Sequence, residues 1–513
     1  MTTTPVSKPD SRYRHHIFTP DSRYRLKAHQ EYGQANFAWL ASMVLTFILL
    51  ASSYDFVGKT LRPFIFCAFV AYSFFTGLQF VIARKIRRDL LVFGHIRNRT
   101  RALGYALLAG IATGNLFVAA SAFGLIKKQK TPEYSLAVYM VLTGLFVAAA
   151  SALNVFKPYV ADTFLAAMTV LLAIALFHLA ALLIVAKRVR EHRAVPGLKW
   201  LAYPLILTSV TGNLFSLLLG LKLLFRIRQQ TNPSSAQAGD VWEKLTKNTA
   251  SMLGLFFIAF LVSLSVTGFF TFSYSMAINN NYGAILQPPS LAYPFGTDDF
   301  GRCLFTRMVF GARISLAVGI ASTVIPMVIG GLLGAVSGYF GRRTDNVIMR
   351  ALDILYAIPG MLFAIAIIAA FGANMVNLVL ALSAGAIPTY ARTMRANVLQ
   401  VSNYEYVEAA RALGAGSLAV LFKHIVPNSL APMIVKSTLT VGGAVISTSS
   451  LSFLGLGVEP HIPEWGNILK LGSAYLETHP YLAVYPGLAI MALVLSFNFL
   501  GDGLRDALDP KTG

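Results

Sequence analysis

Residues 405–433 of this 513-residue chain read EYVEAARALGAGSLAVLFKHIVPNSLAPM and combine charged, small and helix-breaking residues. Glu408 is followed by two alanines, and the glycine at 414 comes after a run of strong helix formers. Glycine permits a sharp turn that a Cβ would obstruct. We therefore expect two short helices at an angle, the second over about 417–425 and ended by Pro427. We expect such a helix pair to lie outside the membrane, where its exposed surface could bind a partner protein.

The rest of the chain carries no residue pattern typical of an enzyme. Its nine histidines are scattered, and Cys67 and Cys303 have neither a disulfide framework nor metal-ligand spacing. The sequence GKT at 58–60 resembles the end of a phosphate-binding loop, but residue 53, where that loop needs glycine, is serine. We expect no catalytic residue, no metal site and no cofactor bound by this chain.

Composition identifies an all-α polytopic membrane protein. The chain is 56% hydrophobic and only 13% charged, and many of its apolar stretches reach the roughly 20 residues that a membrane-spanning helix needs. The net charge of +21 comes from lysines and arginines between these stretches. Such clusters are typical of cytoplasmic loops, so we expect a lipid bilayer and no nucleic acid as partner.

Apolar stretches and linkers divide the chain into four parts. A polar, basic, cytoplasmic tail occupies 1–36, and a linker at 226–250 separates a six-span region, 37–225, from a second membrane domain, 251–510. The predicted spans are 37–54, 63–83, 102–126, 135–156, 162–186 and 200–224 in the first region and 251–274, 313–338, 351–371, 376–396, 429–455 and 484–501 in the second.

Two short repeats in the first region indicate a duplicated three-helix unit. MVLT occurs at 43–46 and 140–143, and TGNLF occurs at 113–117 and 211–215. Three spans per copy would place the two copies in opposite orientations, as in many transporters.

Loop charges agree only in part with six spans in this region. The tail and the loop at 84–101 are rich in arginine, which favours a cytoplasmic location for both. The basic loop at 187–199 falls on the outer side in a six-span count. Either this loop departs from the rule or one predicted span does not cross. We expect both termini to be cytoplasmic.

The segment at 405–433 resembles the EAA loop of ABC importer permeases, through the run EAA at 408–410, the glycine at 414 and the ending IVP at 425–427. Further stretches resemble the dipeptide, oligopeptide and nickel subgroup of these inner-membrane permeases. They are FGTDDFGRCLFTRMVFGARISLAVGI at 295–320, DNVIMRALDILYAIPG at 345–360, SLSFLGLGVEPHIPEWGNIL at 450–469 and FNFLGDGLRDALDP at 497–510. The resemblance covers 245–510, and the extension before it is unrecognised.

The resemblance implies a type I permease core of six helices in a bacterial inner membrane. Partners would be ABC ATPase subunits, which bind ATP and Mg and hydrolyse the nucleotide, a second permease subunit and an extracytoplasmic binding protein. The residues implied in ATPase coupling are Glu408, Ala409, Ala410, Arg411, Gly414, His424 and Pro427. Structural or pathway roles fall to Asp345, Arg350, Asp353 and Pro359.

Two of these positions carry specific expectations, and Cys303 departs from the family's pattern. Asp353 lies three residues after Arg350 on the same predicted helix, so we expect these two to pair. Pro359 is expected to kink its helix. Cys303 stands where the family commonly has aspartate, so any ion pair made from that position is lost.

The implied function is ATP-driven import of di- or oligopeptides, with nickel or another small solute as an alternative. A different class, the gradient-driven secondary transporter, would place paired ionisable residues at mid-membrane, and few are present in the spans. The first region could be a fused second permease, but no EAA-like segment precedes residue 408. An accessory role fits it better.

Overall fold

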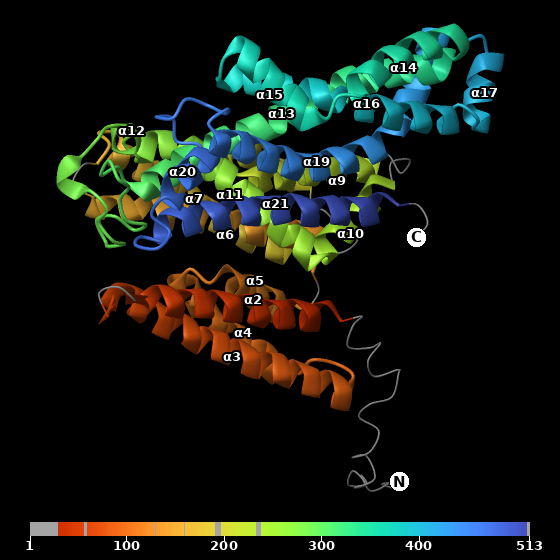
Figure 1. Cartoon of the computed structure of the whole chain (residues 1–513). Helices are drawn as coiled ribbons and strands as arrows, with labels where there is room; N and C mark the ends of the chain where they lie inside the picture. The colour runs from red at the N-terminus through yellow and green to blue at the C-terminus, as the bar shows by residue number, and fades with distance from the viewer. Residues whose placement is uncertain are drawn as a thin grey trace, which may run out of the picture. The chain divides into compact units, whose positions relative to one another are not determined.

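The computed structural model describes residues 29–55, 59–128, 130–157, 160–189, 196–231 and 237–509. Most of the tail expected at 1–36, namely 1–28, lies outside the described residues, as do parts of the linker and of the loop at 187–199. The chain forms two compact units, Met1–Lys130 and Thr131–Gly513, and each is described by itself (Figure 1).

Unit 1 is a group of four helices and a two-stranded hairpin. Its elements are α2 (Gln30–Ser53), β1 (Tyr54–Asp55), β2 (Thr60–Leu61), α3 (Pro63–Phe93), α4 (Asn98–Leu108), η2 (Ala109–Thr113) and α5 (Leu116–Ile126). Helix α2 packs against both α3 and α5. The buried core of the unit lies between these helices and includes Ile82, Ile86, Leu107 and Leu125.

Unit 2 begins with a second group of four α-helices, in which a short helical turn, η3, follows the first helix where unit 1 has its two strands. Its elements are α6 (Pro132–Ala152), η3 (Leu153–Phe156), α7 (Phe164–Arg188), η4 (Pro196–Leu198), α8 (Lys199–Thr208), η5 (Ser209–Thr211) and α9 (Leu214–Thr231). Helix α6 packs against α7 and α9, as α2 packs against α3 and α5. In both groups the first helix therefore contacts the second helix and the last one.

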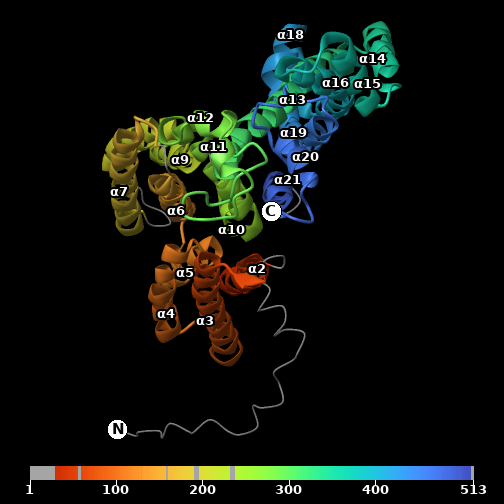
Figure 2. The same cartoon turned by 60° about the vertical axis from the view of Figure 1, so that its left-hand side comes forward.

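The predicted spans 102–126 and 200–224 are not single helices. Each is interrupted at a glycine in the left-handed region, Gly114 with φ of 70° and Gly212 with φ of 80°. Beyond the glycine the chain folds back, so that α4 packs against α5 (Figure 2) and α8 against α9. Of the described helices before the linker, α2, α3, α6 and α7 are long and apolar enough to cross a membrane.

The two arms of each hairpin approach each other at corresponding positions, because Gly104 and Ala202 are 98 residues apart in the chain, as are Ala122 and Gly220. A Cβ built at Gly104 of α4 would lie 3.1 Å from the carbonyl oxygen of Ala122 in α5. In the second hairpin the glycine is on the other arm, and a Cβ at Gly220 of α9 would lie 3.0 Å from the carbonyl oxygen of Ala202 in α8. Because one partner is glycine, the two arms can approach closely.

The tips of the hairpins also correspond. Asn115 is buried and accepts hydrogen bonds from the Ser42 hydroxyl at 3.0 Å and from the Val118 amide at 3.1 Å. Its counterpart Asn213, also buried, donates to the Met140 carbonyl at 3.0 Å. Each asparagine thus ties the tip of its hairpin to the first helix of its own group.

The remaining helices of unit 2 form the second membrane region. They are α10 (Gln237–Lys247), α11 (Thr249–Thr271), α12 (Ser275–Ile278), η7 (Tyr282–Ala284), α13 (Leu304–Phe340), α14 (Arg342–Tyr356), α15 (Gly360–Phe371), α16 (Met375–Val401), α17 (Glu405–Ala412), α18 (Ser417–Ala419), η8 (Val420–Ile425), α19 (Val426–Leu454), α20 (Trp465–Ser473) and α21 (Tyr481–Leu508). In Figure 1, α12 lies at one end of this unit, whereas α17 and the end of α21 lie at the opposite end.

Helices α13 and α16 pack closely through a row of glycines. Gly330, Gly334 and Gly338 recur every fourth residue of α13 and face the backbone of α16. A Cβ at Gly330 would lie 2.6 Å from the Ile387 carbonyl oxygen, and one at Gly338 would lie 2.9 Å from the Arg395 carbonyl oxygen. Small residues at this spacing are typical of close helix packing in membranes. The row holds α16, and with it the segment that follows, against the core.

Candidate coupling surface

Helix α17 is held on the core by one apolar side. Val407 is fully buried, while most of the other side chains of this helix are exposed. Val407 belongs to a cluster with residues of η8, α13, α16 and α19. The other buried members are Ala335, Tyr390, Met394, Val398, Val401, Val420, Leu421, Ile425 and Met433. The helix therefore lies on a rigid base rather than on a free loop.

The outer side of α17 and the turn after it form an exposed, mixed surface. Glu408, Ala409 and Arg411 are exposed. Leu413 is 88% exposed and Leu418 is 64% exposed. Large apolar side chains at this exposure next to charged residues are typical of a protein-binding surface. We call these five residues the α17 surface.

The turn after α17 depends on Gly414. Its φ is 84°, a conformation that other residues rarely adopt. Its amide donates to the Arg411 carbonyl at 2.9 Å, and the amide of Ala415 donates to the Ala410 carbonyl at 3.1 Å. These bonds end the helix in the manner of a glycine C-cap. A Cβ at Gly414 would contact no neighbour within 4 Å, so its backbone conformation, not space, requires glycine.

The expected end of the second short helix at Pro427 is wrong. Residues 420–425 form a π-helical turn, η8, that continues directly into α19. Pro427 is the second residue of α19 and directly follows the π-helical turn, so it does not end the helix. The His424 carbonyl accepts a hydrogen bond from the Asn428 side chain at 2.7 Å. A movement of α17 would therefore act on the base of a continuous membrane helix.

Asp345 links three helices at the base of this region. Both of its oxygens accept bonds from Arg395 of α16, at 2.6 Å and 2.5 Å, and the Ser337 hydroxyl of α13 donates to it at 2.5 Å. Two parallel bonds from arginine fix geometry as well as charge. The start of α14 is thereby attached to both α13 and α16.

The expected pairing of Asp353 with Arg350 is wrong. Asp353 accepts a bond from Arg392 of α16 at 2.7 Å, and the guanidinium of Arg392 lies 4.1 Å from the Tyr356 ring centroid. Arg350 is exposed and makes no ion pair with another described residue. The neighbouring helix α16 offers a closer partner than the same helix does. Pro359 lies at the break where α14 and α15 meet at 78°.

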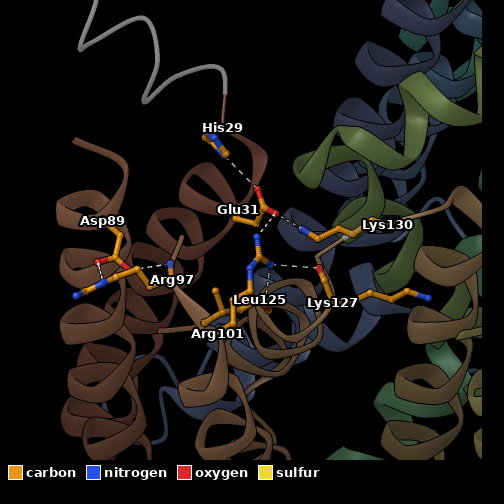
Figure 3. A network of polar contacts seen from close by, with 8 residues as sticks. All are labelled: His29, Glu31, Asp89, Arg97, Arg101, Leu125, Lys127 and Lys130. Atoms are coloured by element: carbon orange, nitrogen blue, oxygen red, sulfur yellow. Dashed lines mark hydrogen bonds and ion pairs between the residues drawn. The ribbon is translucent and has the colours of Figure 1, made fainter. Parts of the chain in front are cut away.

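A polar network marks one end of unit 1 (Figure 3). Glu31, at the start of α2, lies 3.5 Å from Arg101 at the start of α4 and 4.0 Å from Lys130. Arg101 donates to the carbonyl of Leu125 at 3.1 Å, near the end of α5. Burial lowers the pKa of Lys130, and the Glu31 carboxylate opposes that shift. The network shows that both ends of the α4–α5 hairpin lie beside the start of α2.

Sequence reasoning found α17 but missed the apolar part of its surface. Leu413 and Leu418 flank the glycine turn, and an apolar residue on either side of a turn gives no periodic signal by itself. The interhelical partners of Asp345 and Asp353 were also missed, because both lie on α16, a helix distant in sequence. The row of glycines on α13 was visible in the sequence as small residues at every fourth position.

Comparison with known proteins identifies two matching family models. The model described as the binding-protein-dependent transport system inner membrane component matches residues 330–513. The model described as the N-terminal TM domain of oligopeptide transport permease C matches residues 237–289. Both matches lie after the first region.

Curated relatives match about half of the chain. The glutathione transport system permease protein GsiD of Pectobacterium atrosepticum is 39% identical over 272 residues, which are 53% of this chain and 90% of the relative. The dipeptide transport system permease protein DppC of Alkalihalophilus pseudofirmus is 41% identical over 272 residues, 53% of this chain and 89% of the relative. A solved structure of the MetNI methionine ABC transporter covers 40% of this chain and 97% of its own at 20% identity, with a TM-score of 0.34.

Proposed function

The chain belongs to the binding-protein-dependent inner-membrane permeases of ABC importers, and from this premise we propose that it couples to its ATPases through the α17 surface. The observation that carries this proposal is the exposure of Leu413 beside Glu408 on a helix whose other side is packed on the core. An ATPase that binds this surface and moves would act on the base of α19, because α17 packs against η8 through Val407 and η8 continues directly into α19.

The proposed cargo is a short peptide. The relatives are named for the transport of glutathione and of dipeptides, both of which are small peptides. Nickel or another small solute is the alternative. Among the described residues no group of three or more histidine, cysteine, aspartate or glutamate side chains could hold a metal ion. Delivery by an extracytoplasmic binding protein and pairing with a second permease are part of the proposal.

The proposed topology has four crossings before the linker, not six. Both ends of the α4–α5 hairpin meet the start of α2, so the hairpin enters and leaves on one side. Its tip bonds to Ser42, which is about 16 Å along α2 from Glu31 at 1.5 Å per residue. That depth is about half of a hydrocarbon core of roughly 30 Å. We assign the same re-entrant path to the α8–α9 hairpin.

This topology accounts for the loop charges. With two crossings and one re-entrant hairpin per copy, each copy begins and ends in the cytoplasm. The basic loops at 84–101 and 187–199 and the lysines at 127, 128 and 130 are then all cytoplasmic, as the positive-inside rule requires. The opposite orientation expected for copies with three crossings does not arise. Both termini of the chain are cytoplasmic in this proposal.

Affinity purification tests the function. The full chain would be purified in mild detergent from the organism's own membranes, and the proteins that copurify would be identified by mass spectrometry. We expect ABC ATPases, a second permease and a binding protein to copurify. The family of the binding protein would then identify the class of cargo. A parallel sample carrying Glu408→Lys and Leu413→Asp should lose the ATPases because both changes disturb the α17 surface.

A matched control separates docking from folding. Leu476 is 54% exposed and lies after α20, far along the chain from α17. A Leu476→Asp variant adds the same charge to an exposed apolar position and should retain the ATPases. If the native chain is folded and brings down no ATPase, the proposed function is wrong. If both aspartate variants lose the ATPases equally, the α17 surface is not the coupling site.

A further inference from the structure

Arg307, in the first turn of α13, is a fully buried arginine with unused hydrogen-bond donors. Its side chain is 0% exposed, and its Nη1 donates to the Ala277 carbonyl of α12 at 2.8 Å. Its Nε and Nη2 donate no hydrogen bond to any described residue. A buried polar group normally has a partner, and a buried charge needs one even more. Arg307 therefore requires an acceptor besides the Ala277 carbonyl.

The nearest carboxylate is already bonded to its own loop. Asp298 is buried, and its Oδ1 accepts from the amides of Phe300 at 3.0 Å and Arg302 at 2.9 Å. Its Oδ2 accepts from Arg302 Nε at 2.8 Å. Arg307 Nε lies 3.5 Å from the same Oδ2 and makes no hydrogen bond there. Among the described residues no other carboxylate forms an ion pair with either arginine.

The start of α13 carries more positive than negative buried charge. Arg302 is 5% exposed, and its Nη2 also has no hydrogen-bond partner among the described residues. A third buried cation, Lys157, lies 2.5 Å from the Thr306 hydroxyl, and the N-terminus of the helix adds a partial positive charge. Asp299 is only partly buried, and burial together with the charge of Asp298 raises the pKa of Asp299, which disfavours its charged form. Three buried cations thus face one buried carboxylate in the described part of the chain.

We propose that a chloride ion binds between the guanidinium groups of Arg302 and Arg307. Their Nε atoms lie 2.8 Å and 3.5 Å from Asp298 Oδ2, and Nη2 shares an edge of the planar guanidinium with Nε. The unused donors of both side chains are therefore grouped around one oxygen. Chloride would accept hydrogen bonds from these donors and offset the excess positive charge. The inference needs neither the cargo nor the ATPases of the proposed function.

Burial and charge favour chloride over three other partners. A water molecule accepts hydrogen bonds but does not offset the charge. A carboxylate of another protein or a lipid phosphate cannot reach side chains that are 0% and 5% exposed without opening the fold. Asp299 would have to leave solvent for a site where its charged form is disfavoured. All the residues involved belong to unit 2, so the site is built within that unit.

Chloride titration of the purified full chain tests the proposal. The unfolding temperature would be measured in detergent while chloride replaces gluconate at constant ionic strength, from about 1 to about 100 mM. An ion that binds only the folded state stabilises it by mass action, so we expect a rise of at least about 1 °C for each tenfold increase in chloride. Bromide should act like chloride, whereas the larger sulfate should have no such effect.

Two arginine variants locate the effect. Arg307→Met replaces the buried charge with an apolar side chain of similar length, a change that a folded core often tolerates, and it should abolish the dependence on chloride. Arg313→Met is the matched control, because Arg313 lies on the same helix and is exposed. This variant should keep the native dependence within twofold.

A direct measurement on the native chain does not depend on the folding of a variant. Crystals of the full chain grown in bromide should give an anomalous difference peak between the guanidinium groups of Arg302 and Arg307. A peak only at other positions would show an adventitious ion only and would overturn the inference.

Three further results would also overturn it. The first is an unfolding temperature that does not change with chloride, and the second is equal stabilisation by sulfate, which would be a general salt effect. The third is a chloride dependence that is absent from the native chain and appears in Asp299→Asn. That result would assign the balancing charge to Asp299.

Discussion

Lys157 is a buried lysine whose described neighbours include no carboxylate partner. Its ammonium lies 2.5 Å from the Thr306 hydroxyl and 4.8 Å and 5.3 Å from the ring centroids of Phe272 and Phe305. Burial lowers the pKa of Lys157, and the nearby Cys303 thiol opposes that shift. Cys303 also precedes α13 as its N-cap, without a side-chain bond to the helix. With cysteine at position 303, Lys157 has no carboxylate among its described neighbours and α13 has no side-chain cap.

We predict that Cys303→Asp stabilises the protein. Aspartate at this position would accept an amide bond at the start of α13 and pair with the Lys157 ammonium. A helix N-cap alone contributes about 1 kcal/mol, so the unfolding temperature of the purified protein should rise. Thermal unfolding in detergent measures this directly.

Cys303→Ser is the comparison for this test. Serine can cap the helix but carries no charge, so its effect isolates the capping contribution. An unfolding temperature for Cys303→Asp below that of Cys303→Ser would mean that the buried carboxylate costs more than Lys157 returns. The ion-pair argument would then be wrong.

At the scale of elements, helix α17 has one side buried against the core and one side exposed for binding. The buried Val407 and the exposed Leu413 are six residues apart on the same short segment. Changes to the first should act on folding, and changes to the second on binding. This division allows the two effects to be measured separately.

We predict that Leu418→Asp weakens ATPase binding without lowering stability. Leu418 is 64% exposed, so a charge there costs the folded permease little, but it would be buried without a partner in a docked complex. Loss of one such contact typically costs 2 kcal/mol or more at an interface hot spot, about a thirtyfold fall in affinity. Binding of the isolated ATPase to permease in nanodiscs measures this.

Val407→Ala provides the opposite case. It removes buried methyl groups from the base of α17 and should lower the unfolding temperature, with binding lost only in proportion to unfolding. Equal thermal stability of Val407→Ala and the native chain would contradict the account of α17 as an anchored helix.

The hairpins show where sequence reasoning stops at the element scale. Residues 102–126 are apolar for the length of a span, and hydropathy alone does not distinguish one crossing from two short helices that fold back. The signal present was the repeated TGN at 113–115 and 211–213, a glycine and an asparagine inside an apolar run. The six-span count placed the basic loop at 187–199 outside the cell because it counted residues 102–126 as one crossing.

Cysteine labelling tests the re-entrant path. Lys128 is exposed between α5 and α6, and the proposed topology places it in the cytoplasm, whereas three crossings would place it outside. In a background with Cys67→Ser and Cys303→Ser, Lys128→Cys should react with an impermeant maleimide in inverted vesicles and stay unlabelled in intact cells. Lys59→Cys, between β1 and β2, should show the reverse. Labelling of Lys128→Cys from outside intact cells would show that the first copy crosses the membrane three times and that the re-entrant path is wrong.

At the scale of the whole molecule, the permease half was predictable and the first half was not. The EAA segment, the external stretch and the carboxy-terminal stretches lie in the part of the chain that relatives share, and their functional class followed from them. No family resemblance was recognised in the first region, so its function could not be predicted in the same way. Its short repeats indicated a duplication, but the contact of the second hairpin tip with α11, Gly212 against Ser263, joins residues far apart in the chain.

The division into two units also follows from packing rather than from hydropathy. The second copy shares buried contacts with the core, including the Tyr139 and Phe256 rings, 6.2 Å apart. The first copy forms its own unit ending at Lys130. The linker at 226–250 therefore does not separate two structural units. The second copy before it and the permease core after it pack together, although hydropathy divides them.

The most direct measurement is peptide uptake by the purified complex in proteoliposomes, supplied with its binding protein and a labelled dipeptide. The account predicts accumulation that requires ATP on the side of α17, persists when ionophores remove all ion gradients, and falls at least tenfold in a complex carrying Glu408→Lys and Leu413→Asp. Uptake that needs no ATP and stops when the ionophores are added would contradict it, and would identify the chain as part of a gradient-driven transporter.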